Sequence, residues 1–222
     1  MSRYRCPQRD EKGLPMIETV QLFDDDTTRM LRSFIGWTIE SAQGYLLATD
    51  PDQAHKRIRL DLGGITIDVV NEHDSLCIGP GRVCEDVAVM RAEEDSPASI
   101  WHPRGKELTR REFQLTIDDI YTVVDTVILS KGSIRKNKLK QVQALVFRGG
   151  DELLIIDRDI WFDENLVIKW VTIPSEGGYI FEDQIYEAIE DAVRPCAGDW
   201  AAEPPLSYEF DRQISSINSA RR

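Results

Sequence analysis

The chain has 222 residues, of which 41% are hydrophobic and 8% aromatic, so it can build a packed core without disulfide bonds. Its 39 acidic residues outnumber its 27 basic ones, which gives a formal charge of −12. This charge disfavours general binding to nucleic acids or to anionic membranes and favours a basic partner.

The cysteines and the hydropathy pattern predict a cytoplasmic location. Four cysteines are spread along the chain, at Cys6, Cys77, Cys84 and Cys196. Such wide spacing predicts reduced thiols rather than a disulfide framework. The N-terminal segment lacks the apolar stretch of a signal peptide, and no run of residues is apolar enough for a membrane helix, so no membrane association is expected.

The first half of the chain predicts an α/β unit. Residues 1–15 are polar and are expected to form a flexible leader, and the unit follows over residues 16–91. It opens with a helix near residues 27–42, capped by Thr27 or Thr28. From Trp37 the apolar residues alternate, which predicts a small antiparallel meander that ends in a hairpin at Gly63-Gly64.

The second half repeats part of this pattern. After a connecting loop over residues 92–106, a second β unit with a C-terminal helix is expected over residues 107–195. Residues 123–147 align with residues 38–62 at a constant offset of 85, and Gly149-Gly150 follows. We interpret this as a possible internal duplication, the alternative being that short β meanders resemble one another.

Within the second unit, a strand is predicted from Tyr121 to Leu129, because its β-branched content outweighs a competing helical spacing. DIWFD and NLVIKWVTI predict two more strands, and a helix is expected near residues 181–194. Residues 196–222 are predicted to be a tail. The fold class is therefore α+β, a mainly antiparallel sheet with one helix before it and one after it.

An acidic cluster is the best candidate site for binding a partner. It comprises Asp157, Asp159, Asp163 and Glu164, together with Trp161, and we expect it at an exposed strand end. Asp157 and Asp159 alternate along a strand and could jointly hold a divalent cation, so a metal-dependent enzyme of unknown class is one alternative function.

A basic run supplies another alternative. Residues 131–140 concentrate Lys131, Arg135, Lys136, Lys138 and Lys140, which could bind phosphate or nucleic acid, although a solvated loop is the simpler interpretation. His73, Cys77 and Cys84 could ligate a metal, but they lack the short cysteine spacing of most structural zinc sites, so neither a metal nor a cofactor is predicted.

The sequence favours a non-catalytic function. It contains no nucleophile elbow, no phosphate-binding loop and no zinc-protease motif, and it has only three histidines. We therefore expect a protein-binding module that neutralises a basic partner, as an immunity-type or inhibitor-type protein does. Its acidic segments lie at Asp24 to Asp26, Glu93 to Asp95, Asp157 to Glu164 and Glu182 to Asp191.

Overall fold

A computed structural model describes residues 8–9, 15–47, 50–77, 84–94, 108–131, 135–159, 164–175, 179–193 and 206–218. Two helices accompany twelve strands in this part of the chain. The helices are α1 (Asp25–Ser33) and α2 (Glu182–Ala192). The strands are β1 (Gln8–Arg9), β2 (Pro15–Gln21), β3 (Thr38–Leu47), β4 (Asp50–Asp61), β5 (Thr66–Cys77), β6 (Cys84–Glu94), β7 (Leu108–Thr116), β8 (Asp119–Lys131), β9 (Arg135–Gly149), β10 (Glu152–Arg158), β11 (Asn165–Thr172) and β12 (Leu206–Ser216).

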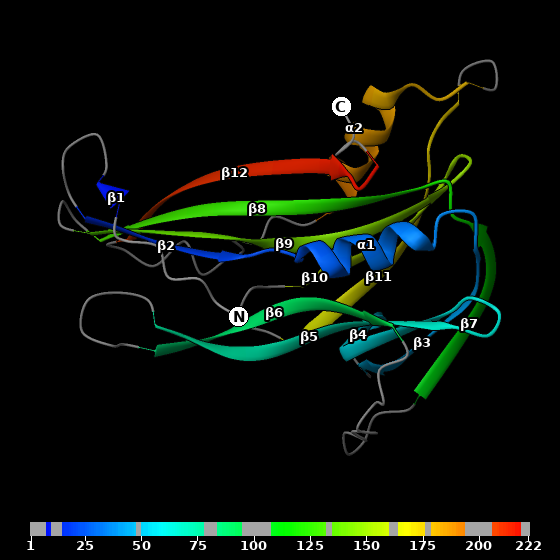
Figure 1. Ribbon diagram of the computed structural model, residues 1–222, viewed down its shortest axis with the longest axis horizontal. Coiled ribbons are helices and arrows are strands. Elements are labelled where there is room, and N and C mark those ends of the chain that lie inside the picture. The colour runs from blue at the N-terminus through cyan, green and yellow to red at the C-terminus, as the bar shows by residue number, and fades with distance from the viewer. Residues whose placement is uncertain are drawn as a thin grey trace.

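The strands stack in two layers (Figure 1). One layer runs β12-β8-β9-β10-β11, with β2 pairing in parallel with the first part of β9. The other layer contains β6-β5-β4-β3-β7, and all its pairings are antiparallel. A short ladder between β11 and β4 joins the two layers. The prediction of a mainly antiparallel α+β fold is confirmed.

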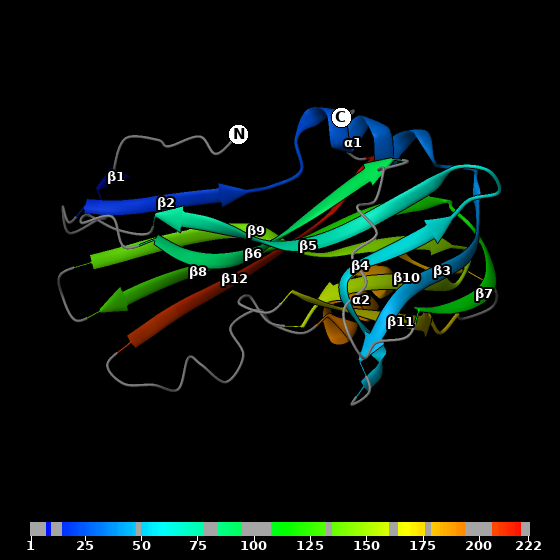
Figure 2. The same cartoon turned by 90° about the horizontal axis from the view of Figure 1, so that it is seen from below.

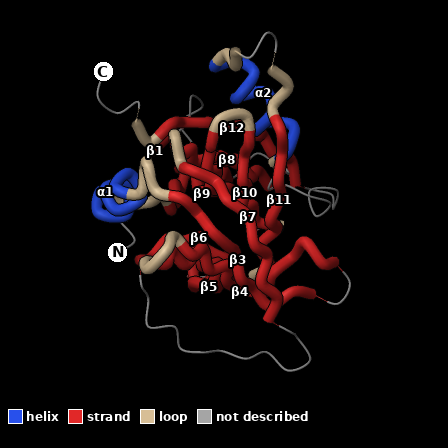
Figure 3. Tube along the Cα trace, turned by 90° about the vertical axis from the view of Figure 1, so that its right-hand side faces the viewer, coloured by secondary structure: helices blue, strands red, loops and turns tan. Residues whose placement is uncertain are grey.

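The principal core fills the space between the two layers, which lie one above the other in the end-on view of Figure 3. Leu31 and Phe34, in and just after α1, enter it at one side. Strands from both halves of the chain contribute, among them Ile58 of β4 and Phe147 of β9. The predicted units therefore share one core.

A second core lies between α2 and the outer face of the β8-β9-β10 layer. Its buried residues include Leu153 and Ile155 of β10 and Ile185 of the helix. Leu154 and Ile156 face the principal core instead, so β10 is buried on both sides. This explains why its sequence is continuously apolar rather than alternating.

The start and end of α1 differ from the prediction. Asp24 caps the helix, because its side chain accepts a hydrogen bond from the Thr27 backbone N–H at 2.8 Å, so the expected threonine cap is wrong. The helix ends at Ser33 rather than near residue 42. Gly36 follows with φ +90°, a conformation that suits glycine and stops the helix before β3.

Both glycine pairs lie at turns. Gly63 and Gly64 have φ values of +77° and +126° and connect β4 to β5, so the predicted hairpin is confirmed. In the second pair only Gly150 has a positive φ, while Gly149 ends β9.

The strand predicted over Tyr121–Leu129 is also confirmed, as part of β8, and the helical alternative is wrong.

The duplication is not confirmed by the strand registers. Ala42 pairs with Leu60 in the β3-β4 ladder. At the offset of 85 their counterparts are Val127 and Leu145, but Val127 pairs with Leu139. Each half contains a four-stranded meander, β3-β4-β5-β6 and β8-β9-β10-β11, and their ladders do not share one register.

Two predicted connections are partly wrong. Leu206–Ser216 form β12 and pair with β8 along its length, so this part of the expected tail belongs to the sheet. The first residues of the predicted 92–106 loop extend β6 to Glu94. The rest of that loop, residues 160–163 of the DIWFD strand and most of the 1–15 leader lie outside the described residues.

Neither described helix is long and apolar enough to cross a membrane.

Candidate functional site

Helix α2 presents a uniformly acidic face to solvent. Its eleven residues contain no lysine or arginine, and Ile185 and Ile189 are buried against the second core. Its exposed acidic residues are Glu182, Asp183, Glu187, Glu190 and Asp191. The amphipathic spacing of the two isoleucines thus holds the helix on the sheet and turns its carboxylates outward.

Two exposed aromatic side chains stand at the N-terminal end of this face. Tyr179 is 75% exposed and Phe181 is 60% exposed. The Phe181 backbone N–H donates to the Gln184 side chain at 2.9 Å. Exposed aromatics beside charged groups are typical of the anchors of protein interfaces.

The C-terminal end of α2 is held by cations from other strands. Lys169 of β11 donates to the carbonyl oxygen of Ala192, and Arg212 of β12 donates to that of Val193 at 2.8 Å. These carbonyls carry the negative end of the helix dipole, so nearby cations stabilise them. The helix therefore depends on two strands that are distant in sequence.

Each cation has a buried carboxylate as its partner. Asp125 accepts two hydrogen bonds from Arg212, at 2.7 and 2.9 Å, and Asp157 accepts one from Lys169 at 3.2 Å. Burial lowers the pKa of Arg212, but the hydrogen bonds and charge of Asp125 outweigh it and raise the pKa above its usual value. Asp157 also accepts a hydrogen bond from Gln143 at 2.9 Å.

The predicted acidic cluster is therefore divided. Asp157 is 0% exposed beneath α2, so the expectation that it lies at an exposed strand end is wrong. Asp159 lies beyond the end of β10 and accepts a hydrogen bond from Gln53 at 3.1 Å. Asp163 and Trp161 lie outside the described residues, and their role stays a prediction.

Glu164 belongs to a separate polar junction between β4, β5 and β11. Its carboxylate lies 2.7 Å from Lys56 Nζ, 3.5 Å from His73 Nδ1 and 4.0 Å from His55 Nε2. Burial raises the pKa of Glu164, but hydrogen bonds from Lys56 and the His73 backbone outweigh it and hold the pKa below its usual value. Lys56 adopts φ +64°, an uncommon backbone conformation for a lysine. Sequence patterns carry no signal for this junction, because its members come from three separate segments.

Most of the basic run lies in strands rather than in a loop. Lys131 ends β8, and Arg135, Lys136, Lys138 and Lys140 belong to β9. Lys138 forms an ion pair with Glu18 at 3.0 Å, and Lys140 donates to Gln213 at 3.4 Å. The positive charge of Lys138 is thus partly neutralised within the fold.

The described residues contain no group of three histidine, cysteine or acidic side chains arranged to hold a metal ion. Of the candidate metal ligands, Asp163 and the side chains of Cys77 and Cys84 lie outside the described residues.

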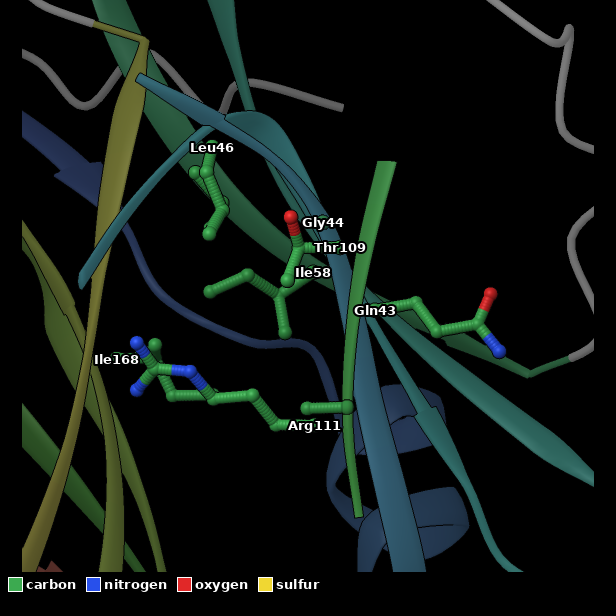
Figure 4. A pocket seen from close by; sticks show the side chains of 9 residues that line it. Gln43, Gly44, Leu46, Ile58, Thr109, Arg111 and Ile168 are labelled. Atoms are coloured by element: carbon green, nitrogen blue, oxygen red, sulfur yellow. The ribbon is translucent and has the colours of Figure 1, made fainter. Parts of the chain in front are cut away.

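A small apolar recess lies where β3, β4, β7 and β11 approach one another (Figure 4). Its volume is ≈ 270 Å³, which includes space open to solvent. Arg111 reaches across it from β7 and donates to Asp52 at 2.7 Å. The space within it that a water-sized molecule can occupy is only ≈ 20 Å³, about what one water needs, so a small-molecule site is not favoured here.

No protein-family model matches the chain, and the searches of curated proteins and of solved structures also find no match.

Proposed function

We propose that the protein binds a basic protein partner without catalysing a reaction, as an immunity-type or inhibitor-type protein does. The observation that carries this proposal is the solvent face of α2, where five carboxylates are exposed and no lysine or arginine of the helix interrupts them. The formal charge of −12 adds a negative electrostatic field around the whole molecule. Such fields speed association with a partner of opposite charge.

The aromatic side chains give this surface a means of specificity. Charge alone attracts basic proteins in general, whereas Tyr179 and Phe181 offer apolar area that a matching pocket can bury. The network beneath the helix supports the same role, because Lys169 and Arg212 fix the end of α2 and thereby preorganise its outer face.

The test compares two variants with equal changes in net charge. One carries Asp183→Lys, Glu187→Lys and Asp191→Lys on α2. The control carries Glu40→Lys, Asp151→Lys and Asp211→Lys, which are exposed on other parts of the fold. A basic protein is first isolated by pull-down from the native host and purified. Its association rate with each variant is then measured by stopped-flow fluorescence over a range of salt concentrations.

We expect the wild-type rate to fall by about tenfold or more between low and high salt. The α2 variant should associate more slowly than the control variant at every salt concentration, because its reversed charges lie at the contact itself. Equal rates for the two variants would contradict the assignment to α2. A salt-independent rate would contradict electrostatic recognition altogether.

A further inference from the structure

The β5-β6 hairpin places two cysteines at directly opposed positions. Its antiparallel ladder runs from the pair Ile67 and Glu94 to the pair Cys77 and Cys84. The register along these eleven pairs shows no bulge or shift. Among the described residues, Cys77 and Cys84 therefore form the last cross-strand pair of a long hairpin, whose two strands run side by side in Figures 1 and 2.

The core fixes this register at the other end of the hairpin. Val69 pairs with Ala92, and their exposed fractions are only 0% and 5%. Ile67 and Met90 are likewise buried in the principal core. A slip of one residue would move these side chains to the opposite face and expose them, so the pairing of Cys77 with Cys84 follows from the packing of the core.

Directly opposed residues of antiparallel strands suit a disulfide. In general their Cβ atoms lie about 4.5–5.5 Å apart, and their Cα atoms about 4.5–5.5 Å apart. A disulfide needs a Cα separation of about 4.4–6.8 Å and a Cβ separation of about 3.5–4.5 Å. A pair in this register therefore needs only a small local adjustment to form the bond.

We propose that Cys77 and Cys84 are a reversible redox pair that forms a cross-strand disulfide and locks the far end of the β5-β6 hairpin. The oxidant is a small-molecule disulfide of the glutathione class. One cysteine thiolate attacks it, forming a mixed disulfide and releasing one glutathione thiolate. The second cysteine thiolate then attacks the protein-bound sulfur and releases the other. Two protein thiols thus lose two electrons and two protons, and one glutathione disulfide becomes two thiols.

The experiment oxidises the folded, full-length protein with glutathione disulfide and maps the bond. Trypsin cuts after Arg59, Arg82 and Arg91, so the two cysteines lie on separate peptides, residues 60–82 and 83–91. The expected product of a non-reducing digest is these two peptides joined, with a mass two hydrogens below their sum. The count of free thiols should fall from four to two.

Matched variants separate this pair from the other cysteines. Cys77→Ser should abolish the joined peptides and leave Cys84 as a mixed disulfide with glutathione, whereas Cys6→Ser and Cys196→Ser should leave the joined peptides unchanged. The oxidised protein should also melt at a higher temperature than the reduced protein, because the bond restricts the unfolded chain. Retention of four thiols, or joining of Cys77 to Cys6 or Cys196, would overturn the proposal.

Discussion

Replacing Asp157 with asparagine tests whether the polar network beneath α2 stabilises the fold. Asp157 is 0% exposed, and its carboxylate accepts hydrogen bonds from Gln143 and Lys169. The substitution keeps the size of the side chain but removes its charge. Lys169 then keeps a positive charge at a site where its counter-ion is missing.

The expected loss of stability follows from the burial of the ion pair between Asp157 and Lys169. Removing one partner of a buried ion pair costs about 3–5 kcal/mol. Because the Lys169 side chain keeps 23% exposure and can be partly hydrated, we expect a loss near the lower limit, about 3 kcal/mol. For a chain of this size each kcal/mol lowers the melting temperature by roughly 2–4 °C, so Tm should fall by about 6–12 °C.

The assay is urea and thermal denaturation at neutral pH, followed by circular dichroism. Asp211→Asn is the matched control, since Asp211 is exposed, and it should change stability by no more than about 0.5 kcal/mol. The double variant Asp157→Leu with Lys169→Met should recover part of the loss, because it removes both buried charges. A cost below about 1 kcal/mol for Asp157→Asn would refute the reasoning.

Three further outcomes are expected. The pKa of Glu164 is lowered in the folded protein, so its carboxylate stabilises the fold above the unfolded pKa, and this contribution is lost as pH falls. Between about pH 5 and 3, the free energy of unfolding of Glu164→Gln should therefore fall less than that of the wild type, as measured by denaturation. A Cβ on Gly149 would lie 2.5 Å from the Thr116 carbonyl oxygen, so Gly149→Ala should lower the free energy of unfolding by about 1–3 kcal/mol in urea denaturation. The control is Gly150→Asn, at a residue with φ +60°, and its loss should be smaller. Burial raises the pKa of Tyr121 to about 12, so the stability that its neutral form contributes should be fully present below pH 10.0 and be lost as pH rises from 10.0 to about 12. Alkaline denaturation of Tyr121→Phe should lack this loss.

Local patterns predict the elements whose cause is local. The turn at Gly63-Gly64 follows from the positive φ that both residues adopt, and β8 follows from its β-branched residues. The helix before β3 ends earlier than its apolar spacing predicts, because Gly36 stops it with a positive φ. These features need only neighbouring residues for their explanation.

The polar network could not be predicted in this way. Asp157 is 12 positions from Lys169 and 14 from Gln143, and the helix that covers it begins only at Glu182. In the sequence, a carboxylate near the end of an apolar strand looks the same whether it is exposed or buried. One signal for burial was present: Lys169 is a single cation within the apolar strand β11, and such a cation needs a partner when it is buried.

The position of β12 has a consequence for the order of folding. Arg212 and Asp125 are separated by 87 residues along the chain. All the other residue pairs of the β12-β8 ladder are also far apart in sequence. Until β12 pairs, β8 presents an open edge and Asp125 must remain hydrated, so α2 lacks one of the two groups that hold its C-terminal end. Such distant pairing slows folding. The C-terminal end of the acidic helix should therefore become ordered late, only once β12 has paired with β8.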